Sequence, residues 1–164
     1  MTSLKPVVTI KPLREADRAW ANELAVEYWG STLVISRGKR HDISTQPGFV
    51  AWRGTQRAGL LTYHIEGRDC EVTALASATE NIGAGSALLA AVEDAARAAG
   101  CSRVWLITTN DNLHALGFYQ RRGYRLVAVY PGALDETRKI KPQIPLTGLN
   151  NIPLRDEIEL EKML

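Results

Sequence analysis

The sequence has few of the residues that build disulfide scaffolds or metal sites. Among 164 residues there are only two cysteines, Cys70 and Cys101, in neither CxxC nor CxxH spacing. A disulfide framework or a zinc site therefore has no support, and we interpret both as small buried thiols. The histidines His41, His64 and His114 are far apart and form no metal-ligand pattern, so we expect no metal.

Long apolar runs and a strong charge imbalance are missing as well. No stretch is long enough to cross a bilayer and no signal-peptide pattern follows Met1, so we expect a cytoplasmic protein that does not contact a membrane. The formal net charge of +2 is too small to indicate a nucleic-acid partner. The basic clusters at 37–40 and 121–122 are interpreted as solvated surface.

What is present is an ordinary globular composition, with 45% hydrophobic and 23% charged residues. A chain of this length can bury a sizeable core, and we expect residues 1–164 to form a single domain. No internal repeat or low-complexity tract interrupts it.

Hydrophobic periodicity in the first half predicts one helix and several strands. A helix is expected over 14–29, with Trp20, Leu24 and Tyr28 on one face and Gly30 at its end. The segment 31–44 is ambiguous between a short helix and a mobile loop. Strands, the last three forming an antiparallel meander, are predicted at 7–11, 49–52, 58–65 and 70–76.

The second half alternates between helical and strand patterns. The order of strand, glycine turn, helix and strand predicts a right-handed crossover between parallel strands. The segment 131–153 holds four of the seven prolines and is predicted to be a long ordered loop or hairpin-like excursion. It would contact the acceptor, cover a sheet edge or form a dimer contact. Helices are predicted at 85–99 and 112–122, and strands at 104–107, 125–129 and 157–160.

The most informative segment is 80–89, where Gly83 and Gly85 open directly into a helix. The first turn of a helix leaves its backbone N–H groups unpaired, and the helix dipole places positive charge at the same end. Glycines also allow a ligand to approach the backbone closely. This pattern is typical of a site for an anion such as a pyrophosphate.

A second motif, 112–124, reads NLHALGFYQRRGY and follows a strand-like run. Together the two segments resemble the GNAT family of acetyl-CoA-dependent N-acetyltransferases. The first is similar to that family's signature of Arg or Gln followed by x-x-Gly-x-Gly/Ala, except that Glu80 stands at the Arg or Gln position. A carboxylate there would repel a phosphate unless it points outward.

The resemblance implies an α/β (α+β) fold with a mixed, mostly antiparallel twisted sheet of about six to seven strands, a central parallel pair and flanking helices. It implies transfer of an acetyl group from acetyl-CoA to a primary amine, without a metal. Coenzyme A would be held through its pyrophosphate by backbone amides, and the Ser86 hydroxyl could add a contact. The residues expected to form this turn are Ile82, Gly83, Ala84, Gly85 and Ser86.

The resemblance also implies catalytic roles. Tyr119 would protonate the departing thiolate, although Phe118 and Tyr119 also suit a packing pair. Glu71 would deprotonate the amine, although a glutamate in such a position is also typical of an exposed strand residue without a catalytic role. Asp111 is an alternative base.

Two further groups are expected to contact the cofactor. Asn112 would contact the pantetheine arm or serve only as a helix N-cap. A backbone N–H near Leu75 or Ala76 would polarise the thioester carbonyl.

The acceptor, a small molecule or a protein amine, is not selected by the sequence. Dimers are common in such families, so a homodimer is one expectation. A non-catalytic acyl-CoA sensor of the same fold is an alternative function, and an unrelated fold binding another nucleotide is a third.

Overall fold

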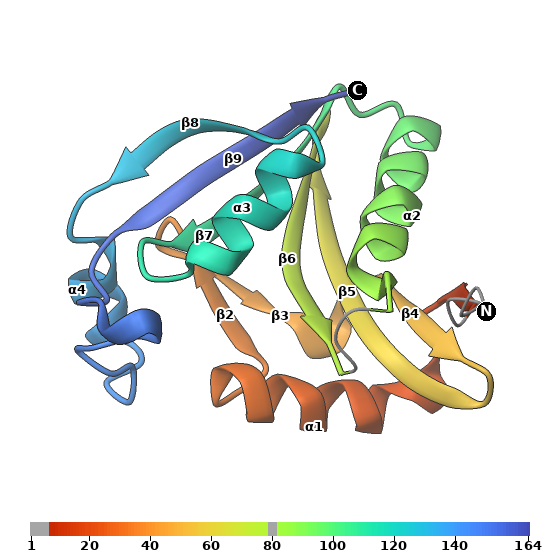
Figure 1. The fold of residues 1–164 in the computed structure, drawn as a ribbon, viewed down its shortest axis with the longest axis horizontal. Coiled ribbons are helices and arrows are strands. Elements are labelled where there is room, and N and C mark those ends of the chain that lie inside the picture. Colours follow the sequence, from red (N-terminus) through yellow and green to blue (C-terminus); the bar gives the residue numbers. More distant parts are fainter. Residues whose placement is uncertain (1–6, 79–81) are drawn as a thin grey trace, which may run out of the picture.

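One twisted sheet of seven strands forms the frame of the molecule, in the order β1-β4-β5-β6-β7-β9-β8 (Figure 1). The structure is a computed structural model that describes residues 7–78 and 82–164. All neighbouring strands are antiparallel except β6 and β7, which confirms the predicted mixed sheet with one central parallel pair. The strands of this sheet are β1 (Val8–Pro12), β4 (Gly48–Arg53), β5 (Gln56–Glu66), β6 (Asp69–Ser77), β7 (Arg103–Thr109), β8 (Arg125–Tyr130) and β9 (Glu157–Met163).

Helices cover both faces of the sheet. Helix α2 (Ala84–Ala98) buries Leu88, Leu89 and Val92 against the strands in the larger core, to which α3 (Leu113–Arg121) also contributes. Helix α1 (Arg18–Trp29) packs on the opposite face against residues of β5 and β6. The predicted helices and strands of the main sheet are thus confirmed, because their apolar periods match the faces they bury.

The two central strands separate halfway along their length. Parallel pairing joins Asp69–Val72 only to Arg103–Leu106. At the same point the register between β5 and β6 shifts, leaving Thr73 as an extra residue on β6. Such a bulge bends its strand, and Figure 1 shows β6 and β7 running apart below their paired ends.

Segment 31–44 is neither a short helix nor a loop, as the sequence had suggested, but a hairpin of β2 (Leu33–Ser36) and β3 (Lys39–Asp42). Its two-residue turn has positive φ at both Arg37 (51°) and Gly38 (75°). This turn type favours Asn-Gly or Gly-Gly pairs. An arginine at its first position gave only a weak sequence signal.

Segment 131–153, predicted to be a long ordered loop or hairpin-like excursion, is ordered and includes an antiparallel bridge between Thr147 and Pro153. It contains the short helix α4 (Ala133–Arg138) and a 3-10 turn at Leu149–Asn151. Two other short 3-10 turns lie at Glu15–Asp17 and Ile43–Thr45. Across residues 7–78 and 82–164, no helix is long and apolar enough to span a membrane.

Candidate active site

The divergence of β6 and β7 opens a cleft of about 1100 Å³. One side of it is formed by the start of α2 and by α3. The other side is formed by the end of α1, by β2, by Glu71 of β6 and Glu157 of β9, and by the segment that includes α4. We call these the turn side and the hairpin side, and residues from both sides line the same cavity.

The turn side contains the glycine turn that the sequence analysis predicted to bind an anion. Gly83 adopts φ 81° and ends the loop, and the first amide of α2 that bonds within the helix is that of Ala87, to Gly83 O at 3.1 Å. The amides of Ala84, Gly85 and Ser86 therefore lack helical acceptors, and Gly83 to Ser86 all line the cleft.

Other residues of this turn have separate roles. A Cβ on Gly85 would lie 2.9 Å from Phe118 Cζ, so a glycine lets α3 pack closely against the turn. Ile82 packs against the core. Glu80 and Asn81 lie outside the described residues.

Two arginines at the end of α3 add positive charge to the turn side. Arg122 Nε donates to Ser86 Oγ at 2.8 Å, and its guanidinium stacks 3.6 Å from the Phe118 ring centre. Burial and the adjacent Arg121 lower the pKa of Arg122. Both arginines line the cleft, where Arg121 is exposed, as predicted, and Arg122 is half-buried rather than fully solvated. The helical spacing of Phe118 and Arg122 was the signal that could have placed Arg122 here.

Tyr119 lies on α3, lines the cleft and is 8% exposed. Its ring packs edge-on against Phe118 and Tyr124, with centroid distances of 5.2 and 5.8 Å. Tyr119 therefore packs against neighbouring aromatic rings and also lines the cleft, so its packing role does not remove it from the candidate site. Burial raises the pKa of Tyr119, so its hydroxyl stays protonated at neutral pH.

Asn112 and Asp111 precede α3 and have structural partners. Asn112 Oδ1 accepts from Ala115 N at 3.1 Å, which makes it the helix N-cap, while its side chain also lines the cleft. Asp111 is buried, and its oxygens accept from Thr109 Oγ1 and from Leu149 N. It does not line the cleft, so it secures a loop rather than facing an acceptor.

The backbone of β6 presents different groups to its two neighbours. Ala78 N, just after β6, donates to Ala58 O of β5 at 2.8 Å, whereas Tyr63 N of β5 donates away from β6, to Pro47 O, at 3.1 Å. Backbone N–H groups of successive residues in a strand point to opposite sides. The N–H of Ala76 therefore points toward β5, as that of Ala78 does, and the N–H of Leu75 points toward the split between β6 and β7. Of the two predicted donors, the register favours Leu75 because β7 has already moved away.

Glu71 lies just before the bulge and is 4% exposed, so it is not an exposed strand residue. It lines the cleft. Burial is the main effect on this carboxyl group and raises its pKa, while the Ser36 hydroxyl lowers it. His41 Nε2, from β3, lies 3.1 Å from Glu71 Oε2, although the two are not aligned for a hydrogen bond.

The hairpin side is tied to the far half of the sheet through Arg37. Its backbone N donates to Glu157 Oε2 at 3.0 Å, and its guanidinium donates to Glu159 Oε1 at 3.2 Å and lies 4.8 Å from the Tyr130 ring centre. Glu157 lines the cleft, and burial raises its pKa. The hairpin therefore spans the split between β6 and β7, because it contacts β6 through His41 and β9 through Arg37.

A buried lysine joins the proline-rich segment to this side. Lys141 Nζ donates to Trp29 O and Leu33 O at 3.2 and 2.9 Å, which satisfies carbonyls at the end of α1 and the start of β2. Burial lowers its pKa. Among residues 7–78 and 82–164, no cluster of three histidine, cysteine or acidic residues suits a metal ion.

Comparison with known proteins identifies relatives over nearly the whole chain. The sequence model of the family described as "Acetyltransferase (GNAT) family" matches residues 14–124. The uncharacterized proteins YdhI and YxbD of Bacillus subtilis (strain 168) are 38% and 42% identical, over 96% and 84% of this chain and 99% and 87% of theirs.

Solved structures share the fold at lower identity. An IAA acetyltransferase from Bacillus cereus superposes with a TM-score of 0.77 at 22% identity, covering 96% of this chain and all of its own. A GNAT family acetyltransferase from Elizabethkingia anophelis with acetyl-CoA bound gives a TM-score of 0.71 at 19% identity, covering 96% of this chain and 98% of its own.

Proposed function

Because this chain belongs to the GNAT family of acetyltransferases, we propose that it transfers an acetyl group from acetyl-CoA to a primary amine by direct attack. The observation that carries the proposal is that Glu71, Tyr119 and the anion turn at Gly83 line one cleft at the split of the sheet. Each supplies a different requirement of the reaction.

The residues on the turn side fit coenzyme A. Free amides at the start of a long helix and two arginines suit a diphosphate, since both carry positive charge. Asn112 lines the same cleft and would contact the pantetheine arm. When bound, acetyl-CoA supplies the activated thioester.

The remaining chemistry falls to three groups of the chain. The N–H of Leu75 would donate to the carbonyl oxygen as it gains negative charge, a contact worth about 3 kcal/mol in comparable sites. The Tyr119 hydroxyl would give a proton to the leaving sulfur. The Glu71 carboxylate would accept a proton from the amine, directly or through water.

The hairpin side suits a cationic acceptor. The buried carboxylates of Glu71 and Glu157 both line it, and such walls attract a protonated amine. This argument covers a small molecule and a protein amine equally.

A screen of amines with acetyl-CoA, followed by thiol release, tests the proposal. The panel should contain amino acids, polyamines, aminoglycosides and peptides with free N-termini. Release that depends on both the protein and one acceptor, and that falls at least about 100-fold in Glu71→Gln, is expected. Coenzyme A binding without transfer to any amine would identify a non-catalytic acyl-CoA sensor instead.

A further inference from the structure

A chain of buried polar side chains ends at Glu71 and has no counterpart among the residues predicted from the sequence. Thr62, Thr73, Gln46 and His41 come from four different segments and are all less than 9% exposed. Thr62 Oγ1 and Thr73 Oγ1 lie 2.9 Å apart, Thr73 donates to Gln46 Oε1, and Gln46 Nε2 lies 3.1 Å from His41 Nδ1. The chain therefore links the bulge in β6 to the β2–β3 hairpin.

The hydrogen bonds in this chain have one consistent direction. An amide nitrogen is only a donor, so His41 Nδ1 must accept from Gln46. Thr73 has one hydroxyl proton and donates it to Gln46 Oε1, so Thr62 must donate to Thr73 Oγ1. A neutral His41 then carries its proton on Nε2, which is the atom that faces Glu71.

We propose that His41 is a positioning residue for acetyl transfer, which holds the Glu71 carboxylate in its proton-accepting form by presenting an Nε2–H set by Gln46 and Thr73. This inference rests on the proposed function, in which Glu71 accepts the proton of the amine. It adds why a carboxylate buried to this degree stays ionised.

The surroundings of the pair support this role. Burial raises the pKa of Glu71, and Glu159 from β9 acts in the same direction, whereas Ser36, Lys39 and Arg37 of the hairpin oppose it. Burial lowers the pKa of His41, and His64 and Lys39 add to this while Glu66 opposes it. These surroundings favour a neutral His41 but on balance disfavour an ionised Glu71, so the carboxylate needs a further stabilising contact, and Nε2 of His41, 3.1 Å from Glu71 Oε2, is placed to provide it.

The pH profile of kcat/KM separates positioning from a merely structural role. In His41→Leu the carboxylate loses the electrostatic contact with the polar Nε2–H group 3.1 Å away, so its pKa rises and the acid limb should move up by about one pH unit. Activity at pH values below the limb should then fall roughly tenfold. His41→Gln, which returns an amide donor near the Nε2 position, should restore the limb toward its original pH.

The matched control is His64→Leu, the same change at a neighbouring ring 5.4 Å away that lies outside the main cleft. It should leave the limb in place. An unchanged limb in a folded His41→Leu protein would overturn the proposal. If Glu71→Gln keeps full activity, the base assignment under the proposed function fails instead.

A second measurement needs no activity. Nitrogen-15 NMR of the parent protein should show a neutral His41 protonated on Nε2 at pH 7, and Gln46→Leu should populate the other tautomer. A parent His41 protonated on Nδ1 would contradict the proposed direction. This readout holds even if His41→Leu fails to fold or if no acceptor is found.

Discussion

The two sides of the cleft are built in different ways. The turn side uses backbone groups of one short segment, Gly83 to Ser86, together with the helix that packs on it. The hairpin side collects side chains from α1, β2, β6, β9 and the proline-rich segment, and several of them are buried. A site made of backbone groups stays the same when the side chains around its glycines change. A site made of side chains changes whenever one of its residues is replaced. The comparison teaches that the turn side depends on local structure, whereas the hairpin side depends on tertiary packing.

The largest effect is expected at Tyr119, on the turn side. Tyr119→Phe should lower kcat roughly 100-fold while leaving both KM values within about twofold, because only the proton donor is lost. Since burial raises the pKa of this phenol, the parent should show no loss of activity from its ionisation up to pH 9. Steady-state kinetics with the acceptor found in the screen measures both.

Tyr124→Phe is the matched control for that variant. Within the described residues the Tyr124 hydroxyl is buried without a hydrogen-bond partner, and the residue does not line the cleft. Its removal should leave kcat unchanged and raise the free energy of unfolding by about 1 kcal/mol. Equal activity of the two Phe variants would exclude Tyr119 as the acid.

The next largest effect is expected from a substitution that disturbs the turn side alone. Gly83 and Gly100 flank the same helix, both with φ 81° and nothing within 4 Å of an added Cβ. Gly83→Ala and Gly100→Ala should each cost about 1 kcal/mol of stability, because a Cβ disfavours this backbone conformation. Only Gly83→Ala should raise KM for acetyl-CoA, by roughly tenfold. The same KM in both variants would argue against a backbone anion site at this turn.

Arg122 tests how much side chains add to that backbone site. Arg122→Gln removes the charge beside Ser86 and should raise KM for acetyl-CoA roughly threefold, with a larger effect at low salt. Arg97→Gln is the control, since Arg97 pairs with Asp94 at the far end of α2. Titration of coenzyme A at two ionic strengths distinguishes them. An affinity independent of salt would show that Arg122 serves only packing.

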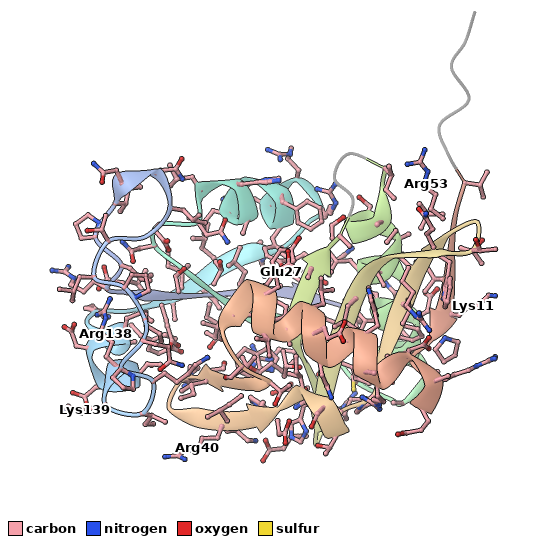
Figure 2. The ribbon with its side chains drawn as sticks, turned by 90° about the horizontal axis from the view of Figure 1, so that it is seen from below. Lys11, Glu27, Arg40, Arg53, Arg138 and Lys139 are labelled. Atoms are coloured by element: carbon pink, nitrogen blue, oxygen red, sulfur yellow. The ribbon has the colours of Figure 1, made fainter. Side chains whose placement is uncertain are left out.

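The smallest effect is expected on the hairpin side. Arg37→Ala removes the contacts to Glu159 and Tyr130 and should raise KM for the acceptor roughly twofold, with no change for acetyl-CoA, because this partly exposed ion pair is worth little. Arg40, on the same hairpin, points away from the molecule (Figure 2) and is exposed. Arg40→Ala should change neither value. A rise in KM for acetyl-CoA in Arg37→Ala would mean that the two sides are not separable.

The outcome of the sequence predictions follows the same division. The crossover from β6 through α2 to β7, the glycine turn and the helix that bears Tyr119 were predicted because each depends on local periodicity and on residues close in sequence. The hairpin at 31–44 was not predicted, because its turn has an arginine with positive φ at a position where the usual sequence signal is asparagine or glycine. Arg122 was assigned to solvated surface because the wall it lines belongs to distant parts of the chain.

By itself, the sequence determined the succession along the chain of the strands in the main sheet, the parallel crossover and the glycine turn at the start of α2, since helix starts and apolar periods depend on neighbouring residues. Only the tertiary structure decided which side chains meet Glu71. His41, Gln46 and Thr73 lie on three segments, and their contact depends on a bulge and a hairpin turn that bring them into one buried space. The direction of the hydrogen bonds among these buried groups depends on which donors and acceptors meet there, and no pattern of neighbouring residues in the sequence predicts it.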